Sequence, residues 1–204
     1  MGMYFRNFKN TDDVDKIAGW IYETDEIEFN YLFSNDEIRA KTALGRLIRS
    51  DHINPYHRNF IMVAADDRTD EIMGVAIAYK GSQVSLKEKY RALIKTECTD
   101  NISIAGYFMI GELFTLAIDD EDYYLGNLYV DEKYRHMHLG SKLVNKVKEN
   151  AKLLNCNNIT LDVVYNKPYL LKFYEKLDFI EDGMNYHKIL SKEYGCYAMK
   201  HPLK

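Results

Sequence analysis

The chain is poor in cysteine and proline and has no long apolar run, and each of these gaps excludes a class of protein. Its three cysteines, Cys98, Cys156 and Cys196, are odd in number and far apart, so we expect reduced thiols and no disulfide framework. No apolar stretch approaches the roughly 18 residues of a membrane-spanning helix. The N-terminus MGMYFRNF also lacks the hydrophobic core of a signal peptide. These features predict a soluble, cytoplasmic protein with no membrane partner.

An excess of positive charge is missing as well. The formal net charge of −4 provides no general attraction for nucleic acid, so we expect no nucleic-acid partner. The chain does have 204 residues, of which 47% are hydrophobic. That is enough apolar material for one full-sized core, and we expect a single domain over residues 1–204.

Local patterns predict alternating strands and helices. Val14, Ile17, Ala18 and Ile21 recur at helical spacing, and Thr11 is the expected cap of that helix. The further strands and helices follow from apolar runs and turn residues. The expected strands cover 4–8, 60–65, 72–79, 125–130, 159–164, 179–182 and 195–201, and the later helices cover 86–96, 104–117, about 141–154 and 169–176.

Two connections between these elements are informative. An acidic and aromatic connection over 22–33 precedes a helix that the capping-box spacing of Ser34 and Glu37 predicts, running through about Ile48. Residues 81–122 are the hardest to read. No linker rich in proline, glycine or serine flanks them, so we interpret them as an insertion between strands and not as a second domain.

The most informative segment begins with the expected strand over 125–130. It leads into a tight basic loop from Tyr134 to Gly140, and a long amphipathic helix follows from about Ser141. Strand, loop and helix in this order present several backbone N–H groups at a helix N-terminus, where the helix dipole favours anions. Arg135 adds a positive charge. The segment therefore suits a ligand that carries a diphosphate.

The strand over 159–164 completes a βαβ unit, which is right-handed almost without exception. Its near-continuous apolar run suits a strand that is covered on both faces. If the two strands separate at one end, their freed backbone groups can pair with an extended arm that contains amides. A diphosphate at the helix start and two amides between the strands describe coenzyme A.

This segment resembles the cofactor-binding core of the GNAT superfamily of N-acetyltransferases, whose loop pattern is R/Q-x-x-G-x-G/A after a strand that ends in L-x-V. Here the strand ends in LYV and the loop reads RHMHLG. Farther on, Asn166 and the stretch FYEKLDF are similar to the N-x-x-A-x-x-x-Y-x-x-x-G-F stretch of that family. The resemblance implies acetyl-CoA as a co-substrate. It assigns the following residues to the cofactor site: Leu128, Tyr129, Val130, Arg135, His136, Met137, His138, Leu139, Gly140, Ser141 and Asn166.

The resemblance also implies a fold and an activity. The fold would be α/β (α+β), with a GNAT-like mixed, splayed and mostly antiparallel sheet of about seven strands flanked by helices. The activity would be transfer of an acyl group, most simply acetyl, from acetyl-CoA to the primary amine of a small molecule, by direct attack in a ternary complex. The insertion over 81–122 would shape the acceptor site. A non-catalytic GNAT-like binding domain and an acetyltransferase for protein lysines or N-termini stay open as alternatives. So does a homodimer, which is frequent in that family.

Two residues depart from the family pattern. His138 stands where the family usually has glycine, and Asp178 stands in the later glycine position. Glycine permits a positive φ and a close approach of the backbone to phosphate. Histidine tolerates such dihedral angles better than most residues do, so we interpret His138 as part of a modified cofactor site. The pair His136 and His138 has no further ligand at metal-site spacing, and we expect no metal.

Tyr174 is the residue that we expect to be catalytic. In the resembled family the tyrosine at this position lies near the cofactor sulfur and protonates the departing thiolate. The alternative is an aromatic side chain that only packs, because the chain has 17 tyrosines. We assign no general base: many relatives have a glutamate early in the fourth strand, and Gly126 and Asn127 at the matching positions cannot accept a proton. The acidic residues before that strand and within 22–33 are interpreted as solvated.

Overall fold

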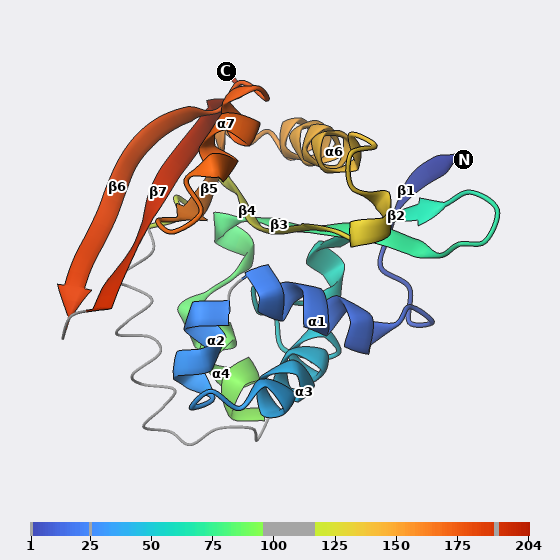
Figure 1. Cartoon of the computed structure of the whole chain (residues 1–204), viewed down its shortest axis with the longest axis horizontal. Coiled ribbons are helices and arrows are strands. Elements are labelled where there is room, and N and C mark those ends of the chain that lie inside the picture. The colour runs from blue at the N-terminus through green and yellow to red at the C-terminus, as the bar shows by residue number, and fades with distance from the viewer. Residues whose placement is uncertain (1, 25, 96–116, 190–191) are drawn as a thin grey trace.

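One seven-stranded sheet organises the described part of the chain (Figure 1). The computed structural model describes residues 2–24, 26–95, 117–189 and 192–204. The strand order is β1-β2-β3-β4-β5-β7-β6, and each neighbouring pair is antiparallel except β4 and β5. The predicted mixed, mostly antiparallel sheet of about seven strands is therefore confirmed. The strands are β1 (Met3–Asn7), β2 (Ile61–Asp66), β3 (Ile72–Lys80), β4 (Tyr123–Val130), β5 (Asn158–Val164), β6 (Ile180–Ile189) and β7 (Lys192–Pro202).

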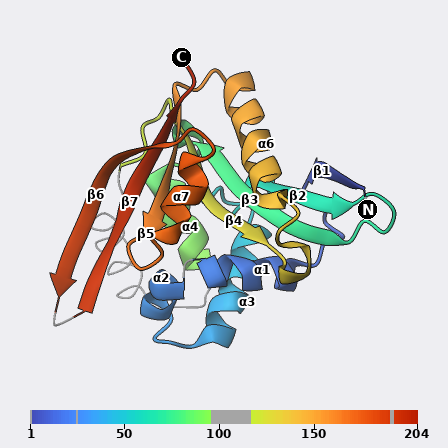
Figure 2. The ribbon, with the colours of Figure 1, turned by 45° about the horizontal axis from the view of Figure 1, so that its top comes forward.

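Helices form a layer on each face of this sheet. Helices α1 to α4 cover one face, which we call the α1 face, and α6 and α7 cover the other, the α6 face (Figure 1 and Figure 2). The helices are α1 (Val14–Thr24), α2 (Glu26–Leu32), α3 (Glu37–Ile48), α4 (Leu86–Lys95), α6 (Leu139–Leu153) and α7 (Tyr169–Glu175).

Each face of the sheet has its own hydrophobic core, and strand residues alternate between the two. On β3, Val75 and Ile77 belong to the core of the α1 face, whereas Ala76 and Ala78 belong to the core of the α6 face. The small alanine side chains leave room for the long helix α6 to cross the central strands. Because both faces are covered, β3 is an almost continuous apolar run.

Two predicted helix caps are wrong. Helix α1 begins after Asp13, whose carboxylate accepts a backbone N–H of the first turn at 2.9 Å, so Asp13 is the cap in place of Thr11. Helix α3 begins after Asp36, which accepts a backbone N–H at 3.0 Å, whereas Ser34 has a φ of 53° outside the helix. Aspartate, serine and threonine are near-equivalent caps, so a segment that holds several of them does not reveal which one is used. The connection over 22–33 also contains α2, which the pattern did not predict.

Other boundaries differ less. The hairpin of β2 and β3 and the helix α4 are confirmed, and α6 begins two residues before the expected start at Ser141. β6 and β7 are longer than predicted because they pair with each other as a long hairpin (Figure 1). β5 is not covered on both faces, since buried and half-buried residues alternate along it. The predicted helix over 104–117 lies almost wholly outside the described residues.

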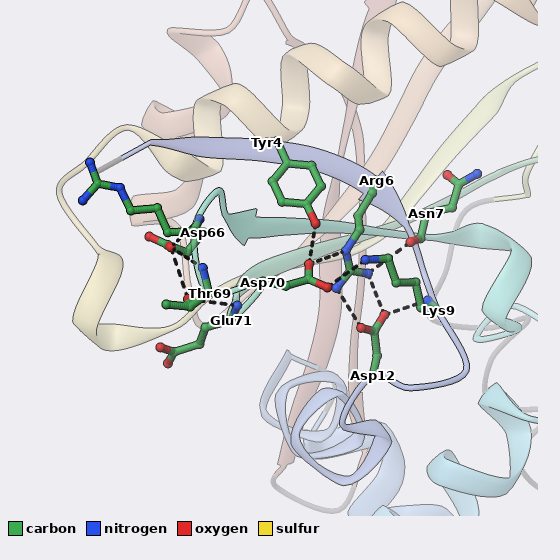
Figure 3. A network of polar contacts seen from close by, with 10 residues as sticks. Tyr4, Arg6, Asn7, Lys9, Asp12, Asp66, Thr69, Asp70 and Glu71 are labelled. Carbon is green, nitrogen blue, oxygen red and sulfur yellow. Dashed lines mark hydrogen bonds and ion pairs between the residues drawn. The ribbon is translucent and has the colours of Figure 1, made fainter.

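A network of polar contacts ties the end of β1 to the turn between β2 and β3 (Figure 3). The Arg6 guanidinium donates to both carboxylate oxygens of Asp12 at 2.8 Å and, through Nε, to Asp70 at 3.0 Å. Lys9 and Tyr4 also donate to Asp70. These donors, with Lys9 first, hold the pKa of Asp70 below its usual value. The side chains of Arg6 and Asp12 are only 10% and 5% exposed, so this pair is largely shielded from water.

Replacing Arg6 with glutamine should destabilise the protein. The change leaves the shielded Asp12 carboxylate without its bidentate partner, which we expect to cost about 2–3 kcal/mol in the free energy of unfolding. Urea denaturation followed by circular dichroism at pH 7 measures this cost. Arg39→Gln removes an exposed guanidinium and serves as the control. Equal stability of the two variants would show that the network contributes little.

Candidate functional site

β4 and β5 pair only where they begin. Their parallel register joins Tyr123 to Ile159 and Tyr124 to Thr160, and the later residues of these two described strands do not pair with each other. β4 stays with β3, whereas β5 continues with β7 and β6 (Figure 1). The predicted splay is confirmed. We call the unpaired part, residues 125–130 of β4 and 161–164 of β5, the wedge; its apex lies at the last register pair.

A β-bulge lies in β4 at this apex. On β3, Ile77 pairs with Asn127 and Ala78 pairs with Leu125, so Gly126 has no partner on that strand. One extra residue shifts the alternation of side chains along the strand. The bulge therefore decides which β4 side chains and amides face the wedge.

Beyond the bulge, Leu128 and Val130 pack against the core of the α6 face, and Tyr129 packs against the core of the α1 face. The N–H of Asp131 donates to the carbonyl oxygen of Met73 on β3 at 3.0 Å. Because amides alternate in direction along a strand, the N–H groups of Leu128 and Val130 point away from β3 and into the wedge. The Tyr129 amide points toward β3, although all three were predicted to face a cofactor.

The loop after β4 contains two residues with left-handed backbone. It begins with a single turn of 3₁₀ helix (Glu132–Tyr134), in which the N–H of Tyr134 donates to the carbonyl oxygen of Asp131 at 2.8 Å. His136 then has a φ of 65° and His138 a φ of 57°. His138 thus adopts the backbone conformation for which a glycine is usual.

Helix α6 begins without a side-chain cap. Its first intrahelical bond runs from the N–H of Lys142 to the carbonyl oxygen of His138 at 3.1 Å, and the His138 side chain makes no capping hydrogen bond. The N–H groups of Leu139, Gly140 and Ser141 precede that first bond and have no partner within the helix. Together with the helix dipole, this arrangement fits an anion such as a diphosphate.

The side chains predicted for the loop differ in accessibility. Arg135, His136 and His138 are exposed. Leu139 is only 1% exposed, and Met137 packs against the same core of the α6 face. Met137 and Leu139 can therefore offer a ligand only their backbone groups.

The charge of Arg135 lies at the wide end of the wedge. Its Nε donates to the carbonyl oxygen of Val130 at 3.3 Å, its Nη1 to Glu132 at 3.1 Å, and its guanidinium lies 5.7 Å from the centre of the Tyr129 ring. The Tyr129 hydroxyl donates to Glu23 at 2.7 Å, and burial together with Glu23 raises the pKa of Tyr129 to about 12. Tyr129 is therefore neutral at pH 7, and the Arg135 guanidinium retains N–H donors for a phosphate beside its contact with Glu132.

Tyr174 lies in the core of the α6 face and is only 8% exposed. Its ring meets those of Phe173 and Phe179 edge to face, with ring centroids 5.0 and 5.7 Å apart. Burial raises the pKa of the Tyr174 hydroxyl well above its usual value. The phenol is therefore protonated at neutral pH and can donate a proton but not accept one.

Asp178, the second departure from the glycine pattern, ends the turn after α7 with a φ of 60°. The N–H of Phe179 donates to the carbonyl oxygen of Tyr174 at 3.1 Å across it. A left-handed residue is the common way to end a helix, which explains why glycine is usual there.

Asn166 lies in the turn between β5 and α7. The N–H of Lys167 closes this turn on the carbonyl oxygen of Val164 at 2.9 Å, and Asn166 itself is exposed. The Lys167 Nζ donates to the carbonyl oxygen of Glu23 at 3.4 Å. Glu23, near the end of α1, therefore contacts both sides of the wedge: its carboxylate accepts from Tyr129 on β4, and its carbonyl oxygen accepts from Lys167 after β5.

Sequence reasoning missed a polar group on the α1 face at the apex. The Tyr124 hydroxyl donates to one carboxylate oxygen of Asp162 at 3.1 Å, and the Cys196 thiol lies 3.5 Å from the other. Nearby, the Asn127 amide donates to the Thr24 hydroxyl at 2.8 Å. The signal was a single carboxylate inside the otherwise apolar run ITLDVV, where an unpaired charge would be costly.

The described ranges (2–24, 26–95, 117–189 and 192–204) contain neither a metal-ligand cluster nor a membrane-spanning helix. No group of three or more histidine, cysteine, aspartate or glutamate residues lies together there as metal ligands would. Within the same ranges, none of the helices is both long enough and apolar enough to span a membrane.

Comparison with known proteins supports one family. No curated protein matches the chain in sequence. An acetyltransferase crystal structure is 20% identical with a TM-score of 0.68, and the match covers 98% of this chain and 100% of that one. The crystal structure of an N-acetyltransferase from Staphylococcus aureus Mu50 is also 20% identical, with a TM-score of 0.68. That match covers 97% of this chain and 99% of the other. The NatC complex bound to Gag peptide and CoA is 14% identical, with a TM-score of 0.51 and 100% of both chains covered.

These likenesses show the fold. A sequence model described as the acetyltransferase (GNAT) family matches residues 21–179, which include the bulge, the loop, the uncapped start of α6, and Tyr174. The chain therefore belongs to the acetyltransferase (GNAT) family.

Proposed function

We propose that the protein transfers an acyl group, most simply acetyl, from acetyl-CoA to the primary amine of a small molecule, by direct attack within a ternary complex. The observation that carries this proposal is the wedge, whose unpaired β4 amides lead from the bulge to the uncapped start of α6. A ligand with a diphosphate at one end and amides along its arm matches both features at once.

The chain's own groups would bind the cofactor in two places. The N–H groups of Leu139, Gly140 and Ser141, with the Ser141 hydroxyl, would hold the diphosphate, and Arg135 would donate to a phosphate oxygen. Among the neighbours, the NatC complex was solved with CoA, which supports this assignment without locating any contact in this chain. Acetyl-CoA supplies the activated acyl group.

The amides of Leu128 and Val130 would orient the pantetheine arm and the thioester. An N–H aimed at the thioester oxygen stabilises the negative charge that develops there during attack. A cofactor with its diphosphate at α6 places its thioester toward the apex, because the strands converge in that direction. Holding both reactants in this position is itself a large part of the catalysis.

Tyr174 would protonate the departing thiolate from the α6 face. Its phenol carries a proton at neutral pH, and the burial that raises its pKa also makes it a weaker acid than an exposed tyrosine. A thiol has an ordinary pKa of about 8.5, so thiolate is already a fair leaving group and the expected gain is modest.

The acceptor would approach from the α1 face. We propose a small molecule because α4, which lies in the described part of the insertion over 81–122, packs on this face and would help to enclose the acceptor site. The NatC structure contains a peptide, so a protein N-terminus or lysine is the second candidate, and the assay below separates the two.

A thiol-release screen tests the activity. Purified protein with acetyl-CoA should release free CoA steadily when the correct amine is present, and a panel of polyamines, amino sugars, amino acids and short peptides identifies the class. Binding of acetyl-CoA without turnover on any amine would favour a non-catalytic binding domain. Turnover on peptides alone would replace the small-molecule acceptor with a protein acceptor.

His138→Val should weaken acetyl-CoA binding about tenfold, whereas His138→Gly should keep the affinity within about threefold. Valine resists the left-handed backbone at a cost of about 1–2 kcal/mol, which glycine avoids, and 1.4 kcal/mol is a tenfold change in affinity. Isothermal calorimetry measures the acetyl-CoA affinity of both variants. Lys152→Val, at the other end of α6, is the control. Wild-type affinity in His138→Val would show that this backbone conformation is not part of the site, and millimolar or absent binding by the wild type would remove the cofactor assignment.

Tyr174→Phe should lower kcat by about 10²-fold and leave the dissociation constant of acetyl-CoA unchanged. The change removes the proton donor while it keeps the packed ring. Steady-state kinetics measures kcat, and calorimetry measures the dissociation constant of acetyl-CoA. Tyr169→Phe on the same helix, where the side chain is 67% exposed, is the matched control. An unchanged kcat in Tyr174→Phe would assign Tyr174 to packing only.

A further inference from the structure

The proposed reaction needs a group that takes a proton from the acceptor. An alkyl amine with a pKa of about 10.4 is almost fully protonated at pH 7, and making it neutral costs about 4.6 kcal/mol. Neither Gly126 nor Asn127 can accept that proton, and the Asn127 amide is already bonded to Thr24. A carboxylate close to the thioester would serve.

Asp162 lies next to the apex of the wedge, where the thioester of the proposed cofactor would be. Thr160 forms the last register pair with Tyr124, and Asp162 is two residues farther along β5, so the Asp162 side chain points to the same face as Thr160. The neighbouring residues Leu161 and Val163 belong to the opposite core, under α6 and α7. Asp162 therefore stands on the α1 face, immediately beyond the apex.

The contacts of Asp162 hold its carboxylate at this point. The Tyr124 hydroxyl reaches across from β4 to one carboxylate oxygen at 3.1 Å, which bridges the two strands at the place where their backbones separate. The Cys196 thiol lies 3.5 Å from the other oxygen. In the described part of the chain, the Thr160 hydroxyl oxygen beside them is buried with no hydrogen-bond partner. An unsatisfied polar atom of this kind is commonly completed by a ligand or an ordered water.

Glu23 is a weaker candidate because of its position. Its carboxylate accepts from Tyr129 beside Arg135 at the wide end of the wedge, where the diphosphate would lie. The bulge at Gly126 lies at the opposite end of the wedge, at the apex. With the thioester toward the apex, as proposed above, Asp162 would be closer to it than the Glu23 carboxylate.

We propose that Asp162 binds the ammonium group of the acceptor and removes its proton, and that Tyr124 positions the Asp162 carboxylate. This inference rests on the proposed function. It places the base on the α1 face of the wedge and Tyr174, the acid, on the α6 face. The amine would attack the thioester carbonyl from one side while the sulfur leaves toward the other.

The proton count closes with these two groups. Asp162 takes one proton from the ammonium and releases it to water after turnover. The neutral nitrogen forms the C–N bond, and as the C–S bond breaks that nitrogen loses a second proton. Tyr174 gives its proton to the thiolate and is restored by the second proton through solvent. The sum is ammonium plus thioester to amide, thiol and one free proton.

Other titratable side chains share this face and must be separated from Asp162. Tyr79 packs against Tyr124 with ring centroids 5.7 Å apart, and Cys196 and Lys200 flank the residue of β7 that pairs with Asp162. On β6, His187 contacts Asn185, which pairs with Cys196. Of these side chains, His187 is the alternative base that must be tested beside Asp162.

Asp162→Asn tests the proposal, because the amide keeps the shape of the carboxylate and can still accept from Tyr124. With the best alkyl amine from the thiol-release screen, we expect kcat/KM at pH 7 to fall by about 10²-fold or more. The loss should shrink as the pH rises, because more of the free amine is then neutral. It should also shrink with hydroxylamine, a small acceptor that is mostly neutral at pH 7. Tyr124→Phe should lower kcat/KM about tenfold with the alkyl amine. As in Asp162→Asn, the loss should be smaller with hydroxylamine.

The controls separate this inference from the proposed function. Asp51→Asn removes an exposed carboxylate and should change nothing, and acetyl-CoA affinity by calorimetry should be the same in Asp162→Asn and the wild type. If the wild type releases no thiol, the proposed function fails. If the wild type does release thiol, three results would overturn the role of Asp162. The first is full activity in Asp162→Asn, and the second is an equal loss of activity with both acceptors at every pH. The third is a loss of activity in His187→Gln but not in Asp162→Asn.

Discussion

β4 and β5 share only two register pairs, and each strand must then satisfy its backbone groups elsewhere. β5 does so with β7, while β4 keeps β3 on one side, and beyond Tyr124 its other edge has no strand partner among the described residues. The start of α6 lies beyond the end of this edge, with its own unpaired N–H groups. The wedge is therefore a continuous row of backbone donors and acceptors, and an extended amide with an anionic end is the kind of ligand that completes it.

In the proposed mechanism the wedge divides the chemistry between the two faces of the sheet. On the α6 face Tyr174 is packed among aromatic rings, and burial raises the pKa of its phenol. On the α1 face the surroundings are polar, and Asp162 is held by hydrogen-bond donors from β4 and β7. An acid that must be protonated and a base that must be ionised need opposite environments. In the proposed mechanism, the opening between β4 and β5 would give one bound ligand access to both environments.

From the sequence, the motif spacing predicted the backbone conformation at two positions of the candidate site. His138 and Asp178 stand at glycine positions, and both have a positive φ. Helix caps were wrong because Thr11, Ser34 and nearby aspartates compete for the same role, and only the folded backbone selects one. Asp162 was missed for another reason. Its meaning depends on the register of β5 against β4 and on the residue at which they separate, which are long-range properties that no local pattern in ITLDVV encodes.

The glycine in the bulge connects the missing glutamate to Asp162. A Cβ at Gly126 would lie 3.4 Å from the ring of Tyr124, in van der Waals contact with it. Without that side chain, the Tyr124 ring can lie over the bulge and its hydroxyl can reach Asp162 on β5. A longer side chain such as glutamate at this position would extend from that contact toward the Tyr124 ring, whose hydroxyl bridges to β5. In this chain Gly126 leaves that place to the Tyr124 ring, and the base that we propose lies on the neighbouring strand.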